Sequence, residues 1–249
     1  MIAARSTITI ACVLVTGVAS AALATVPPFV INESVTTLTF TGAIDHPDYG
    51  LVPLQPVSSG AAVTHYGGDM QARRFLEPLS FRGGDVNAFT NGTYLPGEAP
   101  GNYGFQASLP GPTGNILATL RNFSFELVGN TADTGSGYNV ADVDVVATSG
   151  VFVCDKLPTL SLPGKTAVAV YGTASITTQN LIEQHLRMPI GMSFSEQIPG
   201  SDYVLHFTLT GTVQAVRTLP EPSALMLLGA GALVVLRRRR PMHAQLFVT

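Results

Sequence analysis

The nearest approach to a ligand-binding pattern is the stretch 83–92, in which polar oxygens lie between glycines. Asp85, Asn87 and Asn91 supply carboxylate and amide oxygens, the ligands that a hard cation such as calcium prefers. The stretch lacks the alternating acids and the distal bidentate acid of a dedicated calcium loop, and Asn-Gly turn chemistry accounts for the same composition. Calcium binding is therefore an alternative and not the main prediction.

The chain carries none of the common catalytic patterns. The Gly-x-Ser-x-Gly elbow, the His-Glu-x-x-His zinc motif, the phosphate loop and the dinucleotide fingerprint are all absent. We therefore expect that the protein is not an enzyme. A β-sandwich hydrolase or lyase is the alternative, and it would need acids, or His and Tyr, to converge in one groove. The histidines between the two ends are scattered, with no pair at ligand spacing: His46, His65, His185 and His206.

Prolines and glycine pairs are concentrated between Asp45 and Gly104, which predicts long ordered loops. Loops of that length in a compact domain are often functional, so this is where we look for a binding site. Tyr94, Tyr103 and Phe105 could stack on sugar rings there. A carbohydrate-binding module that uses these loops is the second binding alternative.

Alternation of apolar with small or polar residues predicts several strands, separated by Gly/Pro turns. Strands at short intervals without repeated helical segments predict an all-β ectodomain, an antiparallel β-sandwich or jelly roll. Residues 38–42 and 207–211 look alike, and pairing of the first and last strands would bring the mature N-terminus close to the C-terminal tail. The predicted strands cover 35–41, 123–127, 140–145, 167–171 and 203–213.

Three local patterns complete the middle region. Residues 178–187 form the one helix candidate, with apolar residues at helical spacing before Pro189. Asp142 and Asp144 alternate with valines, as a half-solvated outer strand requires. Cys154 is the only cysteine left after the leader and follows an apolar run, which predicts a buried thiol and no internal disulfide.

Charge excludes one class of partner. The region between the two ends holds 15 acids and 8 basic residues, a net charge of −7. Nucleic-acid binding requires a basic surface, and the only dense basic cluster is Arg237 to Arg240 near the C-terminus. We therefore predict no nucleic-acid partner.

The N-terminal residues have the layout of a secretory signal peptide, covering 1–24. Arg5 precedes an apolar run that passes into small residues. Two small-x-small sites are present, at 19–21 and from Ala22 to Ala24, and we favour cleavage after Ala24, ahead of two prolines. An uncleaved membrane anchor is the alternative.

The C-terminal segment 220–249 has the order of a sorting signal. Pro220, Glu221 and Pro222 precede an apolar span at 223–236, which leads into Arg237, Arg238, Arg239, Arg240 and a short tail. The span is about 21 Å long as a helix, at about 1.5 Å per residue, so it predicts a weak single transmembrane anchor. The arginines keep that side in the cytoplasm, which places the ectodomain, 25–219, outside the inner membrane.

This tail resembles the PEP-CTERM sorting signal in its Pro-Glu-Pro triplet, its short span with Leu227, Leu228 and Gly229, and its arginine cluster. The resemblance covers about twenty residues. It implies recognition by a membrane-embedded exosortase, processing at the triplet, and delivery to the envelope or extracellular matrix of a Gram-negative, polymer-producing bacterium. An ordinary tail anchor is the alternative.

Together these patterns predict an exported protein of the cell envelope, cell surface or extracellular matrix, anchored in the inner membrane before processing. We expect a structural or adhesive component associated with exopolysaccharide or biofilm. Its expected partners are an exosortase, the inner membrane and exopolysaccharide.

Overall fold

The computed structural model describes residues 27–73, 80–129, 131–132, 143–171, 174–179 and 182–219. The regular secondary structure within these ranges consists of strands alone, so the predicted all-β class is confirmed. The strands are β1 (Phe29–Ile31), β2 (Thr37–His46), β3 (Gly50–Pro56), β4 (Val63–Arg73), β5 (Ser80–Ala88), β6 (Tyr103–Leu109), β7 (Gly114–Val128), β8 (Thr131–Ala132), β9 (Asp144–Cys154), β10 (Leu160–Ser161), β11 (Thr166–Tyr171), β12 (Ser175–Gln179), β13 (Glu183–Gln197) and β14 (Val204–Thr218).

The strands form one continuous antiparallel sheet that closes on itself around a single apolar core. From β14 the neighbours run through β2, β3, β6, β7, β9, β11 and β13, and β13 pairs again with β14. Closure leaves few open strand edges. The pairing joins the described strands into one sheet and does not divide them into the two sheets of a sandwich. The more specific prediction of a sandwich or jelly roll therefore stays a prediction.

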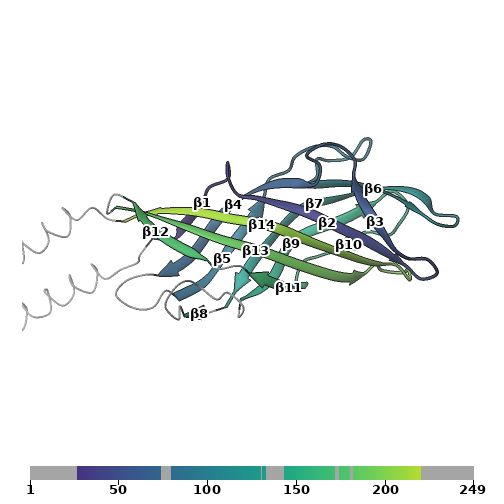
Figure 1. Ribbon diagram of the computed structural model, residues 1–249. Helices are drawn as coiled ribbons and strands as arrows, with labels where there is room; N and C mark the ends of the chain where they lie inside the picture. Colours follow the sequence, from purple (N-terminus) through teal and green to yellow (C-terminus); the bar gives the residue numbers. More distant parts are fainter. Residues whose placement is uncertain are drawn as a thin grey trace, which may run out of the picture.

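The long strands β7 and β14 each have two neighbours in succession. β14 pairs with β2 along its first half and with β1 near its end, while β7 pairs first with β6 and then with β5. The molecule is therefore elongated, with β13 and β14 running along it (Figure 1). We call the end with the β2–β3, β6–β7 and β13–β14 turns the distal end. The proximal end is where β1 begins and β14 finishes.

The first and last long strands pair, as predicted, and the similar residues 38–42 and 207–211 lie opposite each other. The antiparallel register sets Gly42 opposite Phe207 and Gly211 opposite Leu38. A Cβ atom at Gly211 would lie 2.1 Å from the carbonyl oxygen of Thr37, so only glycine fits there. The repeated motif thus lets two strands with large side chains approach closely.

The predicted helix at 178–187 is wrong, because the segment spans the end of β12, a turn and the start of β13. Ser175 to Gln179 pair with Glu183 to Arg187 as an antiparallel hairpin. In β13 buried and more exposed residues alternate with the period of a strand. Pairing with β14 along the whole of β13 overrides the helical spacing of the apolar residues.

The prediction of long ordered loops between Asp45 and Gly104 holds in part. Residues 89–102 form such a segment between β5 and β6, whereas β3, β4 and β5 occupy much of the rest. Two glycine pairs lie inside β4 and β5, and Gly68 and Gly83 each have a φ of 119°, which an L side chain rarely adopts. The register of β4 and β5 also shifts after Gln71, as at a bulge. These two glycine pairs are therefore irregularities within paired strands and not turns.

Two smaller predictions are confirmed. Cys154 is buried at the end of β9, and burial raises the pKa of its thiol, which favours the neutral form. Asp144 is exposed between the buried Val143 and Val145, while Asp142 lies outside the described residues.

In the described ranges no helix is long and apolar enough to span a membrane, and the predicted span 223–236 lies outside them.

Candidate binding groove and sorting junction

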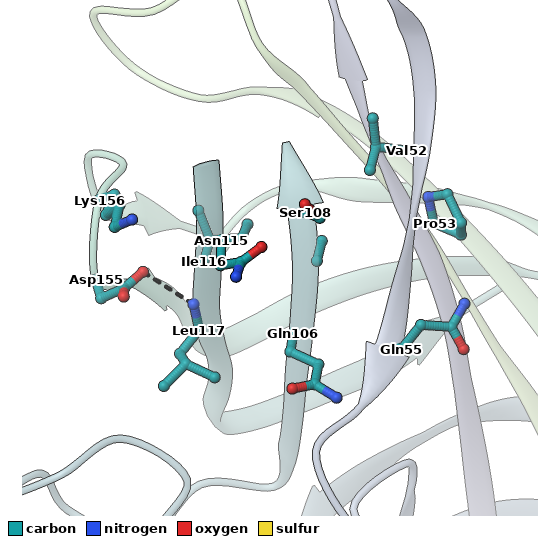
Figure 2. Close-up of a pocket in the computed structure, with 11 residues that line it drawn as sticks. Val52, Pro53, Gln55, Gln106, Ser108, Asn115, Ile116, Leu117, Asp155 and Lys156 are labelled. Atoms are coloured by element: carbon teal, nitrogen blue, oxygen red, sulfur yellow. Dashed lines mark hydrogen bonds between the residues drawn. The ribbon is translucent and has the colours of Figure 1, made fainter. Parts of the chain in front are cut away.

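A groove of about 670 Å³ lies on the outer face of the sheet in its distal half. It forms because β3 and β6 pair only around Gln55 and Pro56. Beyond this point β3 follows β2 while β6 follows β7, so the two strands separate. Figure 2 shows β3 on one side of the groove, and β6, β7 and the residues that follow β9 on the other. Divergence of two neighbouring strands therefore makes the groove.

Apolar and neutral polar residues line the groove in nearly equal number. Gln55 lies directly opposite Gln106, and Ser108 directly opposite Asn115, and all four are exposed. Amides and hydroxyls can both donate and accept hydrogen bonds, as sugar hydroxyls do. The apolar lining residues are Val52, Pro53, Ala107, Ile116 and Leu117.

One acid and one base complete the lining. The Asp155 carboxylate accepts a hydrogen bond of 2.9 Å from the backbone N–H of Leu117, which fixes it beside β7 (Figure 2). The Lys156 ammonium donates one of 2.9 Å to the carbonyl oxygen of Thr113. The two charges cancel, so the lining is neutral within an ectodomain of net charge −7.

The three residues predicted as cation ligands are not brought together as one loop. Asp85 and Asn87 lie on the exposed face of β5, and Asn91 follows the strand. The amide nitrogen of Asn91 donates hydrogen bonds to the carbonyl oxygens of Val63 and Asn102, at 2.7 and 3.0 Å. Asn91 therefore ties the 89–102 segment to β4, and the calcium proposal stays a prediction.

Two acids that sequence reasoning missed lie beside Asp85. Asp69 on β4 and Glu126 on β7 lie directly opposite it across the two strand pairs, so three carboxylates form a row on the outer face. Like charges placed opposite each other destabilise a sheet. In the part of the chain that the structure describes, no group of three His, Cys, Asp or Glu residues is placed to hold a metal ion.

The predicted aromatic platform is wrong for two of its three members. Tyr103 and Phe105 are fully buried in the core, and the Tyr103 hydroxyl lies 2.9 Å from that of Tyr66. Burial raises the pKa of both tyrosines above the ordinary value. Tyr94 packs against Gly104, where an added Cβ would lie 2.2 Å from its ring. Tyr103 and Phe105 therefore pack in the core and cannot stack on a sugar, and Tyr94 packs on the strand that follows the 89–102 segment.

Sequence reasoning also missed the buried Asn102, which organises this segment. Its side-chain oxygen accepts a hydrogen bond of 2.6 Å from the N–H of Phe123, and its nitrogen donates one of 2.8 Å to the carbonyl of Phe89. Asn102 therefore joins the loop to β7 inside the protein. An asparagine among glycines indicates a turn, and nothing in its local sequence marked it as buried.

The proximal end holds the junction with the predicted sorting signal. The N–H of Leu219 donates a hydrogen bond of 2.6 Å to the carbonyl of Ile182, so the sheet holds the chain up to the residue before Pro220. The first strand is alongside, with Val30 opposite Val216. The predicted sorting residues 220–222 and 237–240, and the cleavage residues Ala22 and Ala24, lie outside the described residues.

Comparison with protein families finds the PEP-CTERM protein-sorting motif at residues 218–240. This confirms the resemblance drawn from the tail and marks the chain as an exported protein sorted by an exosortase to the cell envelope. The match begins at Thr218, the last residue of β14. No curated protein and no solved structure matches the chain.

The positions of Asn91 and Asn87 give a test that separates a structural role from cation binding. Asn91→Ala should lower the free energy of unfolding by about 1–2 kcal/mol, because it removes the bonds that hold the 89–102 segment. Asn87→Ala removes an exposed side chain on the neighbouring strand and should change stability by less than about 0.5 kcal/mol. Urea denaturation of both variants, with calcium and with a chelator, measures this.

The Asn91→Ala loss should be the same in both solutions. A calcium-dependent stabilisation of the unmodified protein that both substitutions abolish would contradict this assignment and support a cation site.

Proposed function

We propose that the protein is a structural or adhesive component of the cell envelope or extracellular matrix, delivered there by exosortase sorting. The observation that carries the proposal is the sorting motif at 218–240, which begins in the last strand of the ectodomain. In this proposal the leader is cleaved after Ala24, and the span 223–236 with its four arginines anchors the chain in the inner membrane of a Gram-negative bacterium before processing. The proposal assigns the ectodomain no catalysis.

The placement of the two ends supports this topology. β1 and the end of β14 pair at the proximal end, so a membrane anchor after residue 219 would hold that end at the membrane. The groove lies in the distal half, level with the start of β14 by the register of β3, β2 and β14. β14 has 15 residues, which span roughly 50 Å at about 3.3 Å per residue. The groove would therefore lie far from the membrane.

The sorting proposal predicts a difference between the chain and a variant with Pro220, Glu221 and Pro222 changed to Ala. In an exosortase-positive host, an epitope-tagged chain should give a shortened product in the envelope or medium. The triple variant should stay full-length in the inner membrane, because its recognition triplet is lost. Immunoblots of cell fractions compare the two. Identical size and location would mean that the tail is an ordinary anchor.

The groove favours a second, more specific function, which is binding of a neutral exopolysaccharide. Its exposed amides and hydroxyl match the hydrogen-bonding groups of sugars, and its apolar lining residues suit their C–H faces. An acidic polymer would be repelled by the net charge of −7, whereas a neutral one would not. The hydrolase or lyase alternative needs two or more acids, or His and Tyr, in one groove, and this lining has one acid, Asp155.

Substitution in the groove tests this function. The double variant Gln106→Ala and Asn115→Ala should bind a neutral glucan about tenfold more weakly, since it removes two sets of hydrogen bonds. A matched control is Thr39→Ala with Thr210→Ala, an exposed pair directly opposite each other on β2 and β14. Affinity electrophoresis of the mature protein in gels with the glucan, or with a polyuronate, measures the binding.

The control should bind the glucan like the unmodified protein, and the polyuronate should retard none of the three. Equal glucan binding by the groove variant and the control would exclude the groove as the site.

A further inference from the structure

The end of β14 is held by a buried arginine immediately before the sorting motif. Arg217 is 3% exposed, and its Nε donates a hydrogen bond of 2.7 Å to the side-chain oxygen of Gln184 on β13. Its Nη1 donates one of 2.7 Å to the carbonyl of Ala72 on β4. Its guanidinium carbon lies 4.3 Å from the ring centroid of Phe29 on β1. We call these four residues the strand-end clamp.

The clamp joins the last residues of β14 to strands on both sides. Gln184 lies directly opposite Arg217, and Thr218 lies opposite Glu183. β12 pairs along the outer edge of this part of β13, and β1 pairs with β14 on the other side. Hydrogen bonds to a charged group are stronger than neutral ones, so the end of β14 is held more firmly than a free strand end.

No spacer separates this clamped strand from the motif. The family match starts at Thr218, and Leu219 is still hydrogen-bonded to Ile182. Pro220 follows Leu219 directly in the sequence, so no residue separates the triplet from the last residue that the sheet holds. An enzyme that holds a peptide in its active site must also surround residues that precede the reacting bond. In this chain the residues before the triplet, Thr218 and Leu219, are held by the sheet.

We propose that the strand-end clamp limits sorting: the exosortase engages the motif only when the last residues of β14 detach from β13 and β1. Strand ends open locally without global unfolding, and the cost depends on the bonds that hold them. Arg217 and Gln184 thus act on processing indirectly, by holding the end of β14 in the sheet. The inference rests on the proposed exosortase processing at residues 220–222.

Insertion of a spacer tests the inference without touching the fold. Eight Gly/Ser residues between Leu219 and Pro220 in the full chain should make conversion to the shortened product about tenfold faster, because the motif becomes reachable with β14 in place. Gln184→Ala, which weakens the clamp, should accelerate conversion about fivefold in the chain without the spacer. Pulse-chase labelling in an exosortase-positive host measures the rates.

Two controls separate the clamp from general destabilisation. Leu109→Ala opens a cavity in the distal half of the core and should leave the rate unchanged, although it lowers global stability. In the spacer-containing chain Gln184→Ala should have no effect on the rate, because detachment of β14 no longer limits it.

Each outcome decides between the proposals. Equal conversion rates with and without the spacer would overturn the clamp while leaving exosortase sorting intact. Equal acceleration by Leu109→Ala and Gln184→Ala would show that global unfolding limits processing instead. A full-length product from both chains, or processing that survives loss of the triplet, would overturn the sorting proposal, and the inference with it.

Discussion

The pairing of β2 with β14 is the interaction on which the rest of the structure depends. It joins the start of the ectodomain to its end, and it closes the sheet around the core. Two glycines permit it: Gly211 lies against the backbone of Thr37, and Gly42 lies against the ring of Phe40. This ring stacks on that of Phe207, with 5.3 Å between the ring centroids. A side chain at Gly211 would force these strands apart, so close approach and ring packing are one requirement.

This closure also sets the polarity of the molecule. Because the first and last strands are antiparallel neighbours, β1 and the end of β14 meet at the proximal end, and the turns and the groove lie toward the other. An exported protein with a C-terminal sorting motif needs such an arrangement if its binding surface is to face outward. Its apolar core and buried hydrogen bonds provide the stability, since Cys154 is the only cysteine outside the predicted leader and would have no partner for an internal disulfide once the leader is removed.

Sequence reasoning predicted the features that depend on local pattern and failed where distant partners decide. Alternation in residues 203–213 predicted β14, and its pairing with the first long strand was expected as well. The helix predicted at 178–187 was wrong because β14 pairs with all of β13. The groove could not be predicted, because it arises where β3 and β6 follow different neighbours. Arg217 reads as a surface residue in an alternating strand, and only the fold places it beside Gln184 and Phe29.

We propose that the ectodomain is released from both terminal signals and works outside the inner membrane. Intact-mass and terminal-peptide analysis of the protein recovered from the envelope and medium of its native host tests this proposal. We expect an N-terminus at Thr25 and a C-terminus at or near Pro220–Pro222, with the residues from 223 onward absent. A recovered chain that keeps its leader, or that retains the arginines at 237–240 in the envelope fraction, would contradict it.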